Sequence, residues 1–277
     1  MNTIELIGQT VPRMGYGTMR LPGQNVWGPP KDHDEAIGVL KRSVELGIRV
    51  IDTAWYYGPN VSNELLAEAL FPYPDDLIIV TKLGGKRDDA GKWLPANTSD
   101  ELRRGMELDL RLLKLDVVPV VHLRWMETGS EDDFKAAVGA MMAMQQEGMF
   151  KHLGLSNVTQ EQLDYTLQQT DVVTVSNAYS VQDRHDDAMV DRCAKDNIVY
   201  LPYFPLATGK ADSHEVLQKW AKELQVSASQ VALAALLARS DSMLPIPGTS
   251  SLAHLEENFA ALRIELPGEA MKEISDK

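Results

Sequence analysis

Short runs of apolar residues alternate along this chain with longer segments in which apolar residues recur every three or four positions. The short runs occupy residues 11–17, 48–52, 76–82, 115–122, 152–157, 171–177, 197–204 and 243–248. Most of them are continuously apolar, which is typical of strands that are buried on both faces, as in parallel sheets. We therefore expect eight buried, parallel strands.

The longer segments have the apolar spacing of amphipathic helices. They occupy residues 34–46, 62–70, 98–115, 132–148, 159–169, 182–196, 227–239 and 251–262. Ser62 and either Thr98 or Ser99 are suitable N-cap residues for the second and third of them. Eight strands interleaved with eight helices predict a (β/α)8 barrel, and 277 residues are close to the typical length of about 250 for that fold.

The sequence also predicts how the barrel is capped and that the chain forms one domain. Residues 3–15 predict a short hairpin that caps the bottom of the barrel. No linker rich in Pro, Gly or Ser interrupts the chain, so we expect a single domain over residues 1–277. Pro119, Pro202 and Pro245 fall inside expected strands and lack the N–H that pairing needs, which blurs the boundaries of those strands.

Composition narrows the class of protein. The net charge of −13 repels phosphate backbones, so we expect no nucleic-acid partner. The N-terminus lacks the pattern of a signal peptide, and no apolar run is long enough to span a bilayer. Cys193 is the single cysteine and cannot form an internal disulfide. We expect a cytoplasmic protein without a membrane partner, either a monomer or a weak oligomer.

Three ionisable residues fall at the ends of consecutive strands, namely Asp52, Lys82 and His122. In a (β/α)8 barrel, side chains at these ends build the active site. Each residue alone also has an ordinary interpretation: a turn cap, a solvated lysine or a core histidine. Their joint occurrence at matching positions favours an active site.

A tyrosine pair, Tyr56 and Tyr57, follows Asp52 closely. An Asp–Lys pair would keep the lysine charged, and a cation beside a tyrosine lowers the pKa of the phenol. Such a phenol suits the donation of a proton to a carbonyl oxygen, with His122 bonded to the same oxygen. No side chain delivers hydride, so a nicotinamide cofactor is implied. Spacing alone does not choose between the two tyrosines.

Further strand ends offer contacts for such a cofactor. Ser156 and Asn157 are placed to bond a carboxamide, and Tyr203 offers a flat face for a nicotinamide ring. No G-x-G-x-x-G motif follows a strand, so a Rossmann site is not expected. The segment GTSSLAHLEEN begins a helix with free N–H groups and hydroxyls that suit phosphate.

These residues resemble those of the aldo-keto reductase superfamily over nearly the whole chain. The motif IDTAWYYG resembles the stretch in which the proton-donating tyrosine immediately precedes a glycine, which implies Tyr57. VTK, VVHLR, KHLGLSN, FPLATG and IPGTSSLAHLEEN resemble the other motifs of the family. The resemblance implies the catalytic residues Asp52, Tyr57, Lys82 and His122 and the cofactor contacts Gly17, Thr18, Met19, Asp52, Ser156, Asn157, Ser176, Tyr203, Leu206, Gly248, Thr249, His254, Glu257 and Asn258. It implies no metal.

The chain departs from the family pattern at the cofactor site. Ser176 stands where the family usually has glutamine, and Gly248 and His254 stand where many members have basic residues for the 2′-phosphate. The family implies NADPH, and NADH stays open. Stretches such as GPNVSNELLAEALFPYPDDLIIVTK resemble a bacterial subgroup that includes pyridoxal reductases. An NADPH-dependent reductase of aldehydes or ketones, acting on pyridoxal or another aromatic aldehyde, is the expected activity.

The substrate is expected to be a small carbonyl compound bound among aromatic side chains. We expect Trp27, Trp55, Trp93 and Trp125 near the mouth of the barrel, as pocket walls or as plugs of their loops. Lys86, Arg87 and Arg124 could accept an anionic group or simply be solvated. Two other functions stay open: a lyase that forms a Schiff base on Lys82, and a regulatory subunit that binds cofactor with little turnover.

Overall fold

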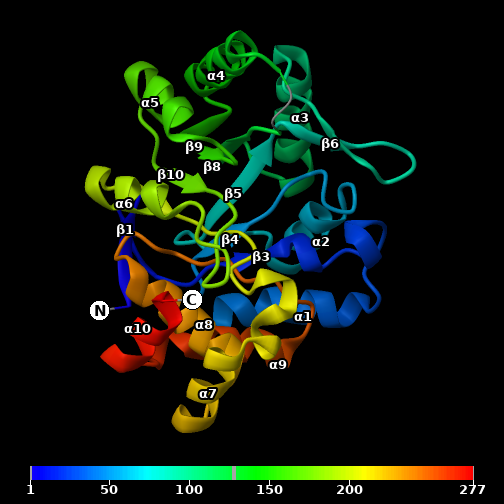
Figure 1. Cartoon of the computed structure of the whole chain (residues 1–277). Coiled ribbons are helices and arrows are strands. Elements are labelled where there is room, and N and C mark those ends of the chain that lie inside the picture. Colours follow the sequence, from blue (N-terminus) through cyan, green and yellow to red (C-terminus); the bar gives the residue numbers. More distant parts are fainter. Residues whose placement is uncertain (1, 127–128, 277) are drawn as a thin grey trace.

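The computed structural model describes residues 2–126 and 129–276 and places seven parallel strands in one sheet. The strands follow one another in chain order, as Figure 1 shows at the centre of the molecule. They are β3 (Tyr16–Gly17), β4 (Val50–Asp52), β5 (Ile78–Leu83), β8 (Val118–Arg124), β9 (Phe150–Ser156), β10 (Thr174–Ser176) and β11 (Val199–Tyr200). A parallel order with helical crossovers confirms the predicted (β/α)8 barrel.

The eighth segment, residues 243–247, closes the barrel without forming a regular strand. On one side the N–H of Leu244 donates to the carbonyl of Tyr200 over 2.9 Å. On the other side Pro245 and Pro247 accept from the N–H groups of Gly15 and Gly17, at 2.9 and 3.5 Å. Because proline has no N–H, these residues cannot donate back toward β3. The predicted strand 243–248 is therefore corrected to a half-bonded edge.

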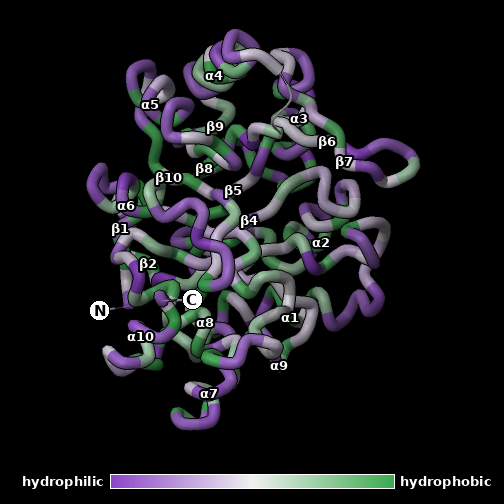
Figure 2. The backbone as a smooth tube through the Cα atoms, viewed as in Figure 1, coloured by the Kyte–Doolittle hydropathy of each residue, from purple (hydrophilic) through white to green (hydrophobic). Residues whose placement is uncertain are grey.

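Helices surround these strands (Figure 1). They are α1 (His33–Glu45), α2 (Val61–Leu70), α3 (Ser99–Leu113), α4 (Glu131–Gln146), α5 (Gln160–Gln169), α6 (Asp187–Asp196), α7 (Glu215–Leu224), α8 (Ala228–Arg239), α9 (Leu252–Ala260) and α10 (Gly268–Ser275). The expected helices correspond to α1–α6, α8 and α9, whereas α7 and α10 were not among them. Figure 2 shows hydrophobic residues concentrated toward the strands and hydrophilic ones on the outer turns.

Local chemistry explains where the helices begin. Thr98 forms the capping box of α3 with Glu101, which selects Thr98 over Ser99 as the cap. Ser62 does not cap α2. The cap position is Asn60, whose φ of 69° is left-handed, and the Ser62 hydroxyl donates to the carbonyl of Thr18 instead. Helix α6 begins five residues later than its expected start at 182, because a turn that pairs Ser180 with Asp183 precedes it.

An antiparallel hairpin of β1 (Thr3–Leu6) and β2 (Gln9–Pro12) caps one end of the barrel, as expected. Its side chains Leu6 and Val11 pack in one buried cluster with Val50 and Val120 from the barrel strands. The predicted strand 11–17 is therefore two strands, since Val11 and Pro12 belong to the hairpin and only Tyr16–Gly17 joins the barrel. The expectation of one domain over residues 1–277 stays a prediction.

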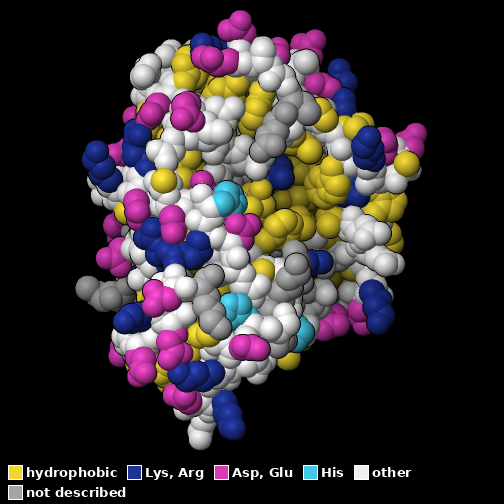
Figure 3. All heavy atoms as spheres, in the orientation of Figure 1, with side chains coloured by type: hydrophobic (Ala, Val, Ile, Leu, Met, Phe, Trp, Pro, Cys, Tyr) yellow, Lys and Arg dark blue, Asp and Glu magenta, His cyan; other side chains and the backbone are white. Residues whose placement is uncertain are grey.

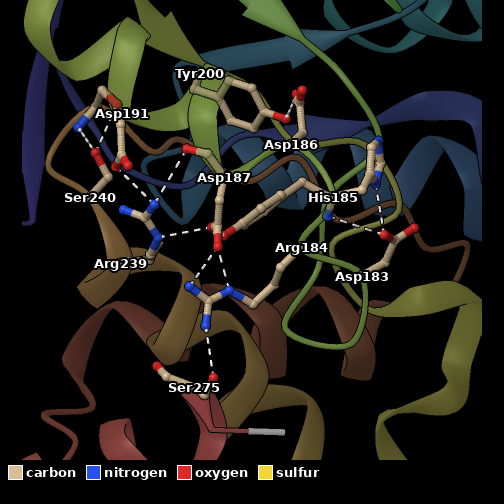
Figure 4. A network of polar contacts seen from close by, with 12 residues as sticks. Asp183, Arg184, His185, Asp186, Asp187, Asp191, Tyr200, Arg239, Ser240 and Ser275 are labelled. Carbon is tan, nitrogen blue, oxygen red and sulfur yellow. Dashed lines mark hydrogen bonds and ion pairs between the residues drawn. The ribbon is translucent and has the colours of Figure 1, made fainter.

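A second hairpin, β6 (Gly85–Arg87) with β7 (Trp93–Pro95), projects from the opposite end, beyond β5 (Figure 1). On the flank of the barrel, a polar network joins the segment before α6 to the C-terminal helices (Figure 4). Asp187 accepts from Tyr179 and Arg184 and pairs with Arg239 of α8, while Arg184 also donates to the carbonyl of Ser275. This network fixes α6 against α8 and α10.

Candidate active site

Three ionisable side chains point into the barrel from neighbouring strands near its carboxyl end. Lys82 of β5 is in register with His122 of β8, and Asp52 is the last residue of β4. None of them is more than 3% exposed. The structure thus brings together the three residues whose convergence was expected from their positions at strand ends.

Asp52 and Lys82 form a buried ion pair. The Lys82 ammonium donates to Oδ1 of Asp52 and, over 3.3 Å, to the backbone carbonyl of Thr53. Oδ2 of Asp52 is buried and has no hydrogen-bond partner in the described part of the chain. Burial raises the pKa of the Asp52 carboxyl, and the charge of Lys82 acts against this rise. An ion pair of this kind carries no net charge as a unit.

Tyr57 lies next to this pair and lines the large groove described below. The Lys82 ammonium is 5.2 Å from the centroid of its ring, and Trp93 contacts the same ring edge-on at 6.2 Å. Burial, followed by the charge of Asp52, raises the pKa of the Tyr57 phenol above its ordinary value. This corrects the expectation of a lowered pKa: the charge of Lys82 is neutralised by Asp52 and lies over the ring face.

Tyr56 has a different environment. It is fully buried, packs edge-on against Tyr57 at 5.3 Å, and its hydroxyl has no partner among the described residues. It does not line the groove, whereas Tyr57 does. Only Tyr57 of the pair therefore presents its side chain to a molecule in the groove.

His122 is fully buried and bonded within the barrel. Its Nε2 lies 2.7 Å from the hydroxyl of Thr174 on β10. Gly154 on the intervening strand makes room for this contact, because a Cβ there would lie 2.3 Å from both the ring of His122 and that hydroxyl. Burial, then the charges of Lys82 and Arg124, lowers the pKa of His122 well below its usual value, so the ring is neutral. Nδ1 of His122 has no hydrogen-bond partner in the described part of the chain, and the expected bond to the oxygen contacted by Tyr57 stays a prediction.

A groove of about 1120 Å³ runs from Tyr57 across the carboxyl end of the barrel to α9. Figure 3 shows hydrophobic side chains gathered around the hollow in this face. The expected cofactor contacts that line it are Gly17, Met19, Asp52, Tyr203, Leu206, Gly248, Thr249, His254, Glu257 and Asn258. Arg20, Lys31 and Phe204 also line it and were not expected, since neither charge pattern nor periodicity marks them.

The floor of this groove requires glycine at two positions. A Cβ on Gly17 would lie 2.8 Å from the carbonyl oxygen of Ile246, and a Cβ on Gly248 would lie 2.7 Å from the carbonyl oxygen of Gly17. Contacts this short are not tolerated by ordinary side chains, so the two glycines allow β3 and the eighth segment to approach each other. Close backbone approach leaves room for a long ligand above them.

The remaining expected cofactor contacts lie behind the groove wall. Ser156 and Ser176 are register partners on β9 and β10, both fully buried, and Oγ of Ser176 has no partner in the described chain. Asn157 donates to the carbonyl of Trp125 over 2.6 Å and accepts from the hydroxyl of Tyr203 over 3.1 Å. Asn157 thereby orients Tyr203. The hydroxyl of Thr18 is directed away, toward Thr53.

Only two of the four tryptophans expected at the mouth lie there. Trp27 is 38% exposed, and Arg87 is placed against the rings of both Trp27 and Trp93, at 5.3 and 4.1 Å. The other two fit the alternative of packing residues and not that of pocket walls. The indole of Trp55 is directed to Gly105 of α3, and Trp125 is 4% exposed and packs edge-on against Phe134 of α4. These two indoles fill the layer between strands and helices.

Two absences hold for the described residues. No group of three or more His, Cys, Asp or Glu side chains there could hold a metal ion. No helix of residues 2–126 and 129–276 is both long and apolar enough to cross a membrane.

Comparison with known proteins gives consistent matches over the full length of the chain. The model of the Aldo/keto reductase family matches residues 13–277. Pyridoxine 4-dehydrogenase of Escherichia coli is 44% identical over 274 residues, which is 98% of this chain and 96% of that protein. A thermostable aldo-keto reductase solved with the inhibitor epalrestat is 27% identical, with a TM-score of 0.83 over 100% of this chain and 99% of the other. An aldo/keto reductase from Klebsiella pneumoniae, solved with NADP and acetate, is 23% identical with a TM-score of 0.81, over 99% and 94% of the two chains.

Proposed function

The chain belongs to the aldo/keto reductase family and is an NAD(P)H-dependent oxidoreductase, and on this premise we propose that it reduces an aldehyde to an alcohol with Tyr57 as the proton donor. The observation that carries the proposal is the position of Tyr57. Its side chain lines the groove beside the buried pair of Asp52 and Lys82, whereas the neighbouring Tyr56 does not reach the groove.

The groove has the features of a dinucleotide site. Backbone at Gly17 and Gly248 forms its floor, and Thr249 accompanies the start of α9, where free N–H groups favour phosphate. Tyr203 also lines the groove and offers a flat face for the nicotinamide ring. Bound NADPH would supply the hydride. The relative from Klebsiella pneumoniae, solved with NADP, supports this choice of cofactor.

The protonation state of Tyr57 suits the reductive direction. Because burial raises the pKa of its phenol, Tyr57 carries its proton at neutral pH and can give it to a carbonyl oxygen that is gaining negative charge. Asp52 holds the ammonium of Lys82 at 5.2 Å from the centroid of the Tyr57 ring, where the cation contacts the face of the neutral phenol. The lowered pKa of His122 keeps its ring neutral, so we assign the proton to Tyr57.

The same ion pair argues against a Schiff-base lyase. An amine must be neutral to attack a carbonyl carbon, but Lys82 is bonded to a carboxylate and is 1% exposed. The ion pair and the burial of Lys82 therefore both argue against a role as a nucleophile. No contact in the described chain favours a purely regulatory role either.

The substrate we propose is an aromatic aldehyde such as pyridoxal. Trp27 and Trp93, held by Arg87, form an aromatic wall near Tyr57 that suits a flat ring. Pyridoxine 4-dehydrogenase, which is 44% identical to this chain, supports the choice, since its name describes oxidation of the corresponding alcohol.

The test is a measurement of NADPH oxidation with a panel of aldehydes that includes pyridoxal, benzaldehyde and an aliphatic aldehyde of similar size. We expect turnover of the aromatic members, with pyridoxal among the best. NADH is compared in the same assay. If no aldehyde or ketone is reduced with either cofactor, the proposed function is wrong; if only aliphatic aldehydes are reduced, the substrate class is wrong and the function stands.

A further inference from the structure

Arg124 is the last residue of β8 and extends the inward-facing row of Val120 and His122 to the rim of the barrel. Residues two apart on a strand share a face, so its side chain is directed to the mouth above His122. The guanidinium carbon lies 5.2 Å from the centroid of the Tyr203 ring, and Nη1 is 3.5 Å from Oγ of Ser156. Its charge also influences the pKa of Tyr57. Arg124 therefore lies beside Tyr203, which lines the groove near Tyr57.

The charges around the mouth do not balance. Asp52 and Lys82 neutralise each other, and Tyr57 is a neutral phenol. Arg124 is partly buried, and no carboxylate of residues 2–126 and 129–276 forms an ion pair with it. Among the described residues, Arg124 thus has no carboxylate bonded to it, in a protein whose net charge is −13. A buried cation without a counter-ion is unfavourable, so a bound anion would be stabilised there.

The other two cations at the mouth are occupied. Lys86 donates to a carboxylate oxygen of Glu101 over 2.5 Å. Arg87 donates to the backbone carbonyls of Asn25, Val26 and Gly91 at distances between 2.6 and 3.1 Å. These residues hold the loops of the mouth together. Arg124, in contrast, bonds the hydroxyls of Ser156 and Tyr203 in the described chain, which leaves some of its N–H donors unused.

We propose that Arg124 binds an anionic oxygen of the substrate, so that the preferred substrates are aldehydes that carry a carboxylate or an ionised phenolic hydroxyl on the ring. A guanidinium presents a fork of N–H donors that matches a carboxylate and also serves a single phenolate oxygen. The cofactor does not need this charge, because a carboxamide is neutral and the phosphates are assigned above to the start of α9, beside Thr249. This inference rests on the proposed carbonyl reduction and specifies its substrates.

The test compares matched aldehydes in steady-state assays with NADPH. One pair is 4-carboxybenzaldehyde and its methyl ester, and the other is 2-hydroxybenzaldehyde at a pH where it is ionised and 2-methoxybenzaldehyde. The readout is the ratio of kcat/KM between the anionic and the neutral member. We expect Arg124→Gln to lower this ratio by about 10-fold to 100-fold for the anion that the site prefers. Arg124→Lys should retain part of the preference, because it keeps the charge and loses the fork.

Arg103→Gln is the matched control, since Arg103 pairs with Glu147 on the outside of α3. It should leave both ratios unchanged. Binding of NADPH, followed by fluorescence, should be the same in Arg124→Gln and in the wild type, and far-UV circular dichroism checks that the variant is folded. If the ratio falls for 4-carboxybenzaldehyde and its ester, the group recognised is a carboxylate. If it falls for 2-hydroxybenzaldehyde and its methoxy analogue, the group is a phenolate.

Two results would overturn the inference. If Arg124→Gln reduces kcat/KM equally for anionic and neutral aldehydes, or weakens NADPH binding by the same factor, Arg124 serves the reaction or the cofactor and not a substrate anion. If the wild type reduces none of these aldehydes, the proposed function fails, and binding tests the anion site separately. Benzoate should then bind the wild type with NADP more tightly than benzamide does. This preference should disappear in Arg124→Gln. Equal binding of benzoate and benzamide rejects the anion site.

Discussion

Lys82 donates a hydrogen bond to Asp52 across strands β5 and β4, and both side chains are almost completely shielded from water. Two opposite charges buried together are tolerated only as a pair, because the removal of one partner leaves the other uncompensated. The pair beside Tyr57 therefore matters for folding as well as for chemistry.

We predict that Lys82→Met lowers the free energy of unfolding by about 3–5 kcal/mol, because it leaves the Asp52 carboxylate buried alone. The double variant Asp52→Asn with Lys82→Met should recover most of this stability and none of the activity. Urea unfolding and NADPH oxidation assays measure the two quantities. A double variant as unstable as Lys82→Met would show that packing, and not the unpaired charge, causes the loss.

The two adjacent tyrosines should separate stability from catalysis. Tyr57→Phe is expected to reduce kcat by about 100-fold to 10,000-fold, with NADPH binding near that of the wild type, because only the proton donor is removed. Tyr56→Phe should keep its activity and lose no stability, since it deletes a buried hydroxyl that has no partner in the described chain. Inactive Tyr56→Phe together with active Tyr57→Phe would reverse the assignment.

The raised pKa of Tyr57 predicts different pH profiles for the two directions. Reduction needs the phenol, so its kcat should stay constant from neutral pH up to the ordinary tyrosine range, near 10. Oxidation of the alcohol needs the phenolate and should rise tenfold for each pH unit over this range, without reaching a plateau. A decline of reduction near pH 7 would show that the phenol ionises early and that Lys82 lowers its pKa after all.

Gly154→Ala should displace His122. A Cβ at this position would lie 2.3 Å from both the His122 ring and the Thr174 hydroxyl, so one of them must move. We expect a destabilisation of about 1–3 kcal/mol and a lower kcat. Gly139→Ala in α4 is the control: nothing lies within 4 Å of its added Cβ, and it should gain about 0.5–1 kcal/mol from helix propensity. Similar effects of the two substitutions would contradict the steric argument.

The sequence predicts the barrel because its signals are local. Continuous apolar runs mark β5 and β8, and capping residues such as Thr98 mark helix starts. Convergence of Asp52 and Lys82 followed from the geometry of parallel strands. Each of these features needs only a segment and its neighbours in the chain.

The remainder of the site depends on contacts between distant segments. The bond of His122 to Thr174 requires the absence of a side chain at Gly154, and the inward or outward direction of Trp125 depends on Phe134 of α4. The pKa of Tyr57 was predicted with the wrong sign because burial, which a sequence does not display, exceeds the effect of a neutralised lysine. Likewise, the sequence does not show that Lys86 is paired with Glu101 whereas Arg124 has no carboxylate bonded to it in the described chain.

The prolines of the eighth segment weaken the junction at which the barrel closes. Between β3 and residues 243–247, hydrogen bonds run in one direction only, so this junction resists separation less than its neighbours do. The groove lies above this junction, and Gly17 and Gly248 form its floor on the two sides of the junction. A dinucleotide bound there would contact both sides of the junction and hold them together. Amide hydrogens near Gly15 and Gly17 should therefore exchange faster than those of β5, and slow sharply when NADPH is added.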